Sequence, residues 1–340
     1  MPRKTTSKAE TNLVTLDIEF DDPQLLGELF GQYDRNIVTI EDRLGVYIAA
    51  RGQRLKIEGQ EEAANQARDV LAGIYNRLEN GQEIDGGAVE AIITMVADPR
   101  VAKIANPNLK SSQIDVSQAP KVMIKTRKKT IFPRSVRQAH YMEALARDDL
   151  IFALGPAGTG KTYLAVAQAV SQLVSGSVDR LILSRPAVEA GEKIGFLPGD
   201  MKEKVDPFLR PLYDALYDTL PAEQVERRIE SGEIEIAPIA FMRGRTLADA
   251  FVILDEAQNT TPAQMKMFLT RFGMNSRMVV CGDPKQVDLP AHATSGLADA
   301  VSKLQDVDKV SMVEFGAADV VRHPLVGKIV EAYEGKDAGG

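Results

Sequence analysis

One eight-residue stretch, GPAGTGKT at residues 155–162, restricts the fold more than any other part of the chain. It follows the apolar run LIFAL and leads into KTYLAVAQAV, whose apolar residues recur at helical spacing. A G-x-x-x-x-G-K-T loop between a strand and a helix turns its backbone N–H groups inward on a phosphate, at a helix N-terminus that favours anions. The stretch therefore predicts a nucleotide-binding α/β fold.

Within this loop, Lys161 supplies a point charge for the β- and γ-phosphates, and the Thr162 hydroxyl is placed to bind Mg²⁺. We therefore expect ATP and Mg²⁺ as ligands. The residues expected to hold the nucleotide are Gly155, Pro156, Ala157, Gly158, Thr159, Gly160, Lys161 and Thr162.

Apolar runs separated by helical patterns fill the chain from Asp149 onward. Near-continuous Val, Ile and Leu strands that alternate with helices indicate a parallel sheet with helices on both faces. An insertion between the second and third runs carries a Gly- and Pro-rich turn ahead of an amphipathic helix. The expected strands are residues 150–155, 180–184, 233–239, 251–255, 277–282 and 309–315.

The run AFVILDEAQNT ends in two adjacent carboxylates, Asp255 and Glu256. After a phosphate-binding loop, the first acid is expected to hold the magnesium shell and the second to orient or deprotonate the attacking water. Two acids at the end of a strand can also be ordinary surface residues. The loop at residues 155–162 favours the catalytic interpretation.

GPAGTGKT, VILDEAQN and CGDPKQ together resemble the PhoH-like ATPases, whose core is similar to the first motor domain of superfamily-one helicases. FPRSVRQAHYMEAL, FMRGRTL, DVVRHPLV and the insertion are also similar to that family, so the resemblance covers residues from about 130 to 333. It implies a P-loop NTPase fold like that of RecA, with a parallel sheet covered by helices on both faces. A small α+β domain is expected to precede this fold.

The resemblance also implies roles for two glutamines. Gln138, which lies 17 residues before Gly155, is a candidate for reading the adenine edge, because its amide offers both a donor and an acceptor. The alternative is a polar surface residue. In GDPKQ, Gln286 would sense the γ-phosphate or its attacking water, and Asp283 would shape the turn beside it.

Three arginines remain open between functional and structural roles. Arg243 and Arg245 in FMRGRT would contact phosphate, a neighbouring subunit or nucleic acid, or else form salt bridges within the fold. Arg322 in DVVRHPLV is a candidate arginine finger and a candidate catalytic residue beside Glu256 and Gln286. The alternative for Arg322 is an ion pair with Asp319.

The first hundred or so residues alternate short strand and helix patterns, which predicts a small α+β domain. Residues 31–59 resemble KH RNA-binding domains, and the aligned G-x-x-G turn is Gly31-Gln-Tyr-Asp34. Asp34 brings a negative charge where that family has a second glycine, so RNA binding and protein contacts both stay open. The expected organisation is a disordered tail (1–10), a KH-like domain (11–105), a linker with a basic segment (106–130), the PhoH-like P-loop ATPase domain (131–335) and a tail (336–340).

The basic segment KVMIKTRKKTIFPR, residues 121–134, contains six basic residues and no acidic one in fourteen positions. Such a segment is either a solvated surface or a contact for a phosphate backbone. The chain as a whole has a net charge of −7, so attraction to nucleic acid must come from local patches of this kind.

Composition restricts the remaining chemistry. The single cysteine, Cys281, cannot form an intramolecular disulfide, and three scattered histidines do not resemble a metal cage. No apolar run approaches the length of a membrane span, so a cytoplasmic location without membrane contact is expected.

The leading functional hypothesis is an ATPase that acts on RNA, as a helicase-like single motor domain. The resemblance implies ribosomal RNA maturation with a partner endoribonuclease of the YbeY type. Only 185 residues follow Gly155, which is space for one motor domain, so a neighbouring copy is expected to close the site in a homo-oligomer. The resemblance points to a hexameric ring. The alternatives are a nucleotide-gated adaptor that hydrolyses ATP slowly and a small-molecule phosphotransferase.

Overall fold

The computed structural model describes residues 13–97 (except 80, 82, 83 and 85), 122–186, 201–290 and 293–320, with the side chains of 201–208 and Ala318 left out. The described residues between 13 and 97, together with Arg134–Val136, form one compact unit. Val122–Pro133 and the described residues from Arg137 onward form the other. No helix in the described ranges is long and apolar enough to cross a membrane.

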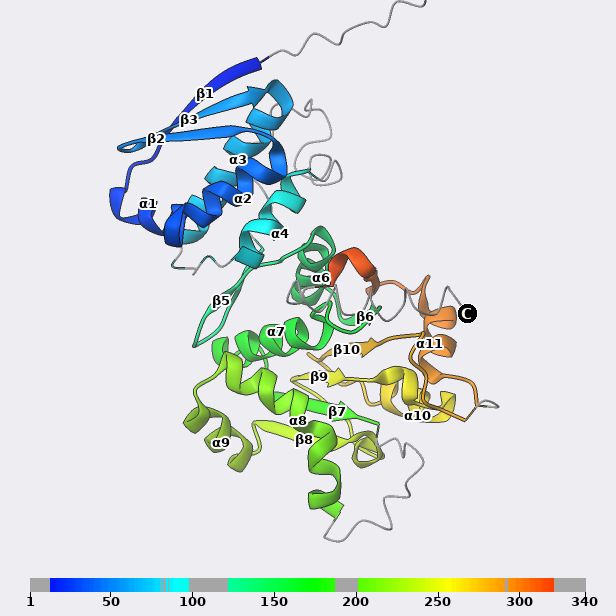
Figure 1. Ribbon diagram of the computed structural model, residues 1–340. Helices are drawn as coiled ribbons and strands as arrows, with labels where there is room; N and C mark the ends of the chain where they lie inside the picture. Colours follow the sequence, from blue (N-terminus) through cyan, green and yellow to red (C-terminus); the bar gives the residue numbers. More distant parts are fainter. Residues whose placement is uncertain are drawn as a thin grey trace, which may run out of the picture. The chain divides into compact units, whose positions relative to one another are not determined.

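The first unit is α+β, as the strand and helix patterns predict. Its three strands are antiparallel in the order β1-β3-β2, with helices packed on the sheet (Figure 1). Buried and exposed residues alternate along β3, so one face of this sheet supports the core. The elements in chain order are β1 (Leu13–Glu19), α1 (Pro23–Phe30), η1 (Gln32–Asp34), α2 (Arg35–Leu44), β2 (Tyr47–Arg51), β3 (Arg54–Gln60), α3 (Glu61–Glu79) and α4 (Gly86–Ala97).

The turn between α1 and α2 is the segment that aligns with the KH turn. Gly31, Tyr33 and Asp34 all have positive φ angles, of 74°, 55° and 55°. Two consecutive non-glycine residues in the left-handed region are uncommon, and the Tyr33 side chain is 99% exposed. The turn therefore presents an aromatic ring and a carboxylate to solvent.

The second unit is built on a six-stranded sheet in the order β11-β6-β10-β9-β7-β8, and every neighbouring pair is parallel. All six expected strands are present. They are β6 (Leu150–Leu154), β7 (Arg180–Arg185), β8 (Ile234–Pro238), β9 (Ala250–Leu254), β10 (Arg277–Gly282) and β11 (Val310–Glu314).

Helices cover both faces of this sheet, as predicted. Side chains alternate along each central strand, so that Ile253 joins one apolar core and Val252 the other. The first core packs against α6 (Val136–Arg147), α7 (Lys161–Ser175), α8 (Met201–Thr219) and α9 (Ala222–Glu230). The second packs against η5 (Ile239–Met242), η6 (Ala257–Asn259), α10 (Pro262–Leu269) and α11 (Gly296–Leu304), and η7 (Ala317–Asp319) follows β11.

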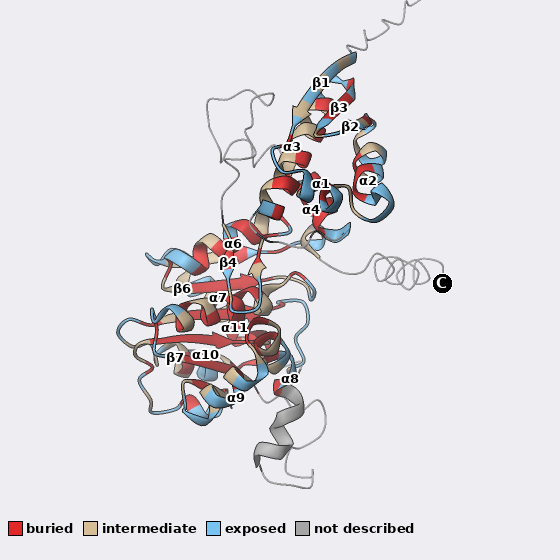
Figure 2. Ribbon diagram, turned by 90° about the vertical axis from the view of Figure 1, so that its left-hand side faces the viewer, coloured by how far each residue is buried: buried red, intermediate tan, exposed pale blue. Residues whose placement is uncertain are grey.

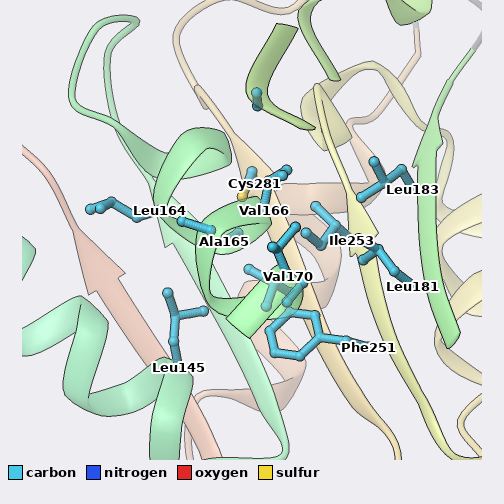
Figure 3. Close-up of a cluster of buried hydrophobic side chains, with 14 of the residues drawn as sticks. Leu145, Leu164, Ala165, Val166, Val170, Leu181, Leu183, Phe251, Ile253 and Cys281 are labelled. Carbon is cyan, nitrogen blue, oxygen red and sulfur yellow. The ribbon is translucent and has the colours of Figure 1, made fainter. Parts of the chain in front are cut away.

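The central strands are buried throughout, which explains their unbroken apolar sequences (Figure 2). In the first core, Val166 and Val170 of α7 face Ile253 and Phe251 of β9, with Cys281 of β10 beside them (Figure 3). This packing fixes α7 on the sheet. The loop that precedes α7 is therefore held rigidly at the carboxyl edge of β6.

The basic segment contains a short hairpin, β4 (Ile124–Lys125) and β5 (Thr130–Ile131), which is antiparallel. Ile124 and Ile131 are cross-strand partners and are 2% and 8% exposed in the first core. Part of the range expected to be a linker, residues 106–130, thus forms a structured part of the second unit.

Candidate nucleotide-binding site

The carboxyl ends of four neighbouring strands place the candidate residues at one edge of the sheet. Leu154 lies opposite Gly282, and Leu254 lies opposite both Val280 and Ser184. In open parallel sheets, ligands bind outside the carboxyl ends of the strands. The loops after β6, β7, β9 and β10 therefore form the walls of one site.

The loop after β6 requires glycine at its first and last turns. Gly155 has φ 139°, and a Cβ atom there would lie 2.5 Å from the Phe315 carbonyl oxygen. Gly160 has φ 82° and is the N-cap of α7, where no side chain accepts a hydrogen bond from the first turn. The N–H groups at the start of α7 are therefore available for an anion.

Lys161 lies across its own loop. Its Nζ donates to the Gly155 carbonyl at 2.7 Å and to the Pro156 carbonyl at 2.8 Å. The ammonium group is thus held against the loop that precedes α7.

Thr162 and Asp255 contact each other directly. The Thr162 hydroxyl donates to Asp255 Oδ1 at 2.6 Å. Burial raises the pKa of Asp255, and the hydrogen bond from Thr162 opposes that rise. A hydroxyl and a carboxylate are hard oxygen ligands, which suit Mg²⁺ with phosphate oxygens completing its shell. Among the described residues, no group of three or more His, Cys, Asp or Glu side chains could hold a metal by itself.

Glu256 is held from two sides. Arg185, at the end of β7, donates to Glu256 Oε1 at 2.9 Å, and Gln258 donates to Oε2 at 2.6 Å. The other end of the Gln258 amide accepts the backbone N–H of Asp283 at 3.1 Å. Gln258, 1% exposed, thus connects Glu256 to the turn after β10.

Sequence reasoning did not single out Arg185 or Gln258. Arg185 ends the apolar run LILSR at the same edge as the phosphate loop, so its position at a strand end was a usable signal. Gln258 lies two residues after Glu256, and only the turn of η6 brings its amide back to that carboxylate. No sequence spacing indicates this contact.

A cavity of about 640 Å³ opens at this edge. Five carboxylate residues and two cationic residues line it, so negative charge predominates among its titratable groups. Its lining comprises Ala157, Gly158, Gly160, Lys161, Thr162, Tyr163, Arg185, Pro211, Asp214, Ala215, Asp218, Asp255, Glu256, Gly282, Asp283 and Gln286.

Of the predicted site residues, Ala157, Gly158, Gly160, Lys161, Thr162, Asp255, Glu256 and Gln286 share this cavity. Gln286 is exposed in the turn after β10, where its N–H donates to the Asp283 carbonyl at 3.0 Å. Asp283 Oδ1 accepts the Lys285 N–H at 2.9 Å, which fixes this turn. The helix α8 adds a wall that the sequence did not predict.

Gln138 lies behind the phosphate loop and is absent from the cavity lining. Its side chain is 4% exposed, and Nε2 donates to the Thr159 carbonyl at 3.0 Å. In this conformation the amide braces the loop, and its predicted contact with adenine stays a prediction.

Two of the three arginines whose roles were open, Arg243 and Arg245, lie among the described residues. Arg245 makes a two-pronged ion pair with Glu235, at 2.6 Å for each contact, which raises the pKa of Arg245. Arg243 is exposed and does not line the cavity. Arg322 lies outside the described residues.

Comparison with known proteins places the chain in a family. The family described as PhoH-like protein matches residues 130–334. A PhoH-like protein of Bacillus subtilis is 46% identical over 326 residues, 95% of this chain and 98% of that protein. One of Synechocystis is 45% identical over 321 residues, 94% of each, and the protein PhoH of Escherichia coli is 48% identical over 205 residues, 60% of this chain and 58% of that protein.

The predicted loop, acidic strand and turn lie around one cavity, and relatives align over nearly the whole length of the chain. This chain therefore belongs to the PhoH-like protein family.

Proposed function

We propose that this protein binds ATP in the cavity at the carboxyl edge of the sheet and hydrolyses it to ADP and phosphate. The observation that carries the proposal is the pairing of Thr162 with Asp255 beside Glu256, at the N-terminus of α7. The loop amides and Lys161 bind the β- and γ-phosphates. Mg²⁺ held by Thr162 and Asp255 would neutralise charge on the phosphate oxygens.

Glu256 acts as the base for the attacking water in this proposal. Arg185 and Gln258 hold its two carboxylate oxygens, so its orientation is set before a nucleotide enters. Gln286 lies on the neighbouring turn and lines the cavity, which supports a contact with the γ-phosphate or the water. Gln258 contacts both Glu256 and the turn after β10. Loss of the γ-phosphate beside Glu256 can therefore shift that turn through the Gln258 side chain.

The test is phosphate release by the purified full-length protein, with Lys161→Ala as the control. We expect Mg²⁺-dependent release of free phosphate from the wild type and loss of release in the variant. Phosphate that appears on an added acceptor, and not in solution, would instead support the phosphotransferase alternative.

We further propose that this ATPase acts in RNA metabolism as a helicase-like motor, in ribosomal RNA maturation with an endoribonuclease partner. Hydrogen bonds connect Glu256 through Gln258 to the backbone of Asp283, in a turn outside the phosphate-binding loop. This connection favours an ATPase that couples hydrolysis to a conformational change over a simple phosphotransferase. Addition of single-stranded RNA is expected to stimulate turnover. Slow turnover that ignores RNA would support the nucleotide-gated adaptor.

A further inference from the structure

The basic hairpin, residues 122–133, is anchored firmly at its base. Ile124 and Ile131 are buried in the core that also holds α6 and α7. At its tip, Thr126 closes the turn: its N–H and hydroxyl both donate to the Lys129 carbonyl, at 2.9 and 2.8 Å. The hairpin is therefore a fixed feature of the second unit.

Every exposed residue of this hairpin is basic. They are Lys125, Arg127, Lys128 and Lys129, and the hairpin contains no acidic residue. Protein interfaces are enriched in aromatic side chains and depleted in Lys, whereas phosphate backbones are contacted mainly by Lys and Arg. Its exposed surface therefore has the composition of a phosphate-binding surface.

Two of the four cations are held by the last turn of α8. Lys128 Nζ donates to the Tyr217 carbonyl at 2.8 Å, and Lys129 Nζ forms an ion pair with Asp218. Cations at a helix C-terminus interact favourably with its dipole. The tip of the hairpin is thus fixed against α8 (Figure 1).

The side chains of the other two cations, Lys125 and Arg127, make no hydrogen bond or ion pair with any residue in the described ranges. Both stand on the fixed ribbon and are exposed to solvent. In a chain whose net charge is −7, they form a local positive site that no carboxylate of the described residues neutralises through an ion pair. Their charge is free to meet an external polyanion.

The hairpin is connected to the nucleotide cavity through Asp218. This carboxylate lines the cavity and accepts the Tyr163 hydroxyl at 2.8 Å, while Lys129 lies 5.6 Å from the centre of the Tyr163 ring. Although partial burial opposes the shift, hydrogen bonds from Lys129 and Tyr163 lower the pKa of Asp218. Tyr163 follows Thr162 directly, so a short chain of contacts joins the phosphate loop to the hairpin.

We propose that the basic hairpin binds the sugar–phosphate backbone of single-stranded RNA through Lys125 and Arg127, beside the nucleotide cavity. This inference rests on the proposed function in RNA metabolism and assigns the surface that would carry it. Asp218 of α8 contacts the hairpin through Lys129 and also lines the cavity, so the proposed RNA site and the proposed nucleotide site share one residue.

The test uses the full-length protein and a fluorescently labelled oligouridylate, with binding measured by anisotropy over a salt series. The variant is the double substitution Lys125→Gln and Arg127→Gln. The matched control, Lys266→Gln with Lys303→Gln, removes two exposed cations from α10 and α11. We expect weaker binding by the hairpin variant and a slope of log K against log salt that is smaller by about 1.4, or ~0.7 for each lost phosphate contact.

The control variant is expected to bind with the affinity and slope of the wild type. Neither Lys125 nor Arg127 lines the cavity, so the hairpin variant should still hydrolyse ATP in the absence of RNA. That activity serves as the control that the variant is folded. An unchanged slope in that variant would overturn the inference and leave the proposed function intact. If the wild type hydrolyses ATP but binds no oligouridylate at low salt, its role in RNA metabolism and the hairpin site both fail.

A competition experiment distinguishes RNA from an acidic protein partner. Unlabelled oligouridylate should displace the labelled strand from the wild type far more effectively than polyglutamate of equal charge. Equal displacement would assign the hairpin to acidic polypeptides and overturn the assignment to RNA.

Discussion

At the scale of single residues, the site contains two neighbouring carboxylates in different surroundings. Asp255 is 7% exposed, and its pKa is raised because burial opposes its charge. The Glu256 side chain is 38% exposed and is held by Arg185 and Gln258. The two acids are therefore suited to different tasks, Asp255 to a cation and Glu256 to a water molecule.

Substitution of Glu256 separates binding from chemistry. We expect Glu256→Gln to bind ATP but to hydrolyse it about 10²–10⁴ times more slowly, because a positioned base typically contributes that factor. The measurement combines single-turnover hydrolysis with nucleotide affinity. Glu223→Gln, at an exposed position on α9, is the control for loss of one carboxylate. Normal turnover in Glu256→Gln would remove Glu256 from the mechanism.

Substitution of Asp255 should have opposite effects on stability and on binding. A carboxylate whose folded pKa is raised destabilises the folded state at pH values above that pKa, so Asp255→Asn should unfold at a higher temperature without ligand. Each kcal/mol gained in the free energy of unfolding raises the Tm by about 2–4 °C in a domain of this size. The same variant should lose the stabilisation that Mg²⁺ with ATP gives the wild type. Thermal unfolding with and without the ligands measures both effects, and a lower Tm in the ligand-free variant would contradict the explanation.

At the scale of elements, the buried sheet was predictable because its central strands are almost entirely apolar. All six strands of the parallel sheet follow from the sequence, and so does the loop before α7. The hairpin was not predicted, because its two-residue strands are too short to show a period and its basic turn has the composition of a linker. The contact of α8 with the cavity was also missed, since α8 follows the insertion after β7 and only folding brings it against the start of α7.

The contact between Asp148, just after α6, and Ser311 of β11 should weaken in acid. Asp148, just after α6, accepts hydrogen bonds from Arg147 and from Ser311 of β11. The hydrogen bond from Arg147 lowers the pKa of Asp148, despite the opposing effect of burial. A lowered folded pKa stabilises the protein above the unfolded value of about 3.9 and ceases to do so as pH falls through the folded value.

The corresponding variant is Asp148→Asn, compared with the wild type by denaturant unfolding between pH 7 and pH 3. We expect the variant to be less stable at pH 7, and we expect the difference to shrink by roughly half or more towards pH 3. A difference that stays constant over this range would show that the charge of Asp148 contributes nothing to this contact.

At the scale of the whole molecule, the described residues contain one six-stranded parallel sheet in one unit and a small α+β fold in the other. The fold class followed from the loop at residues 155–162 together with the six apolar runs. The contacts that orient Glu256 did not, because Arg185 reaches it from the end of β7 only once β7 and β9 pair, and Gln258 reaches it only through the turn of η6. Sequence pattern predicts which strands are adjacent to a site more readily than it predicts which polar side chains meet there.

We propose that a second copy of the chain closes the nucleotide cavity. The specific ATPase activity should then fall on dilution, because dissociated subunits lack the closing surface. Turnover per subunit would be measured over a range of protein concentrations, with mass photometry at each concentration. Full specific activity from monomers would contradict this proposal.

The burial of Cys281 has a kinetic consequence. It is the only cysteine in the sequence and is 0% exposed. Its Sγ atom lies 3.7 Å from the Tyr141 hydroxyl oxygen, and that hydroxyl donates to the Lys161 carbonyl. Burial raises the pKa of its thiol to about 12, so thiolate is scarce in the closed protein and modification must await local opening. The rate at which a thiol reagent labels Cys281 should therefore report how often the packing around Cys281 and Tyr141 opens. A bound nucleotide that stabilises this packing should slow the labelling. Cys281 is thus a built-in probe of local opening next to the nucleotide site.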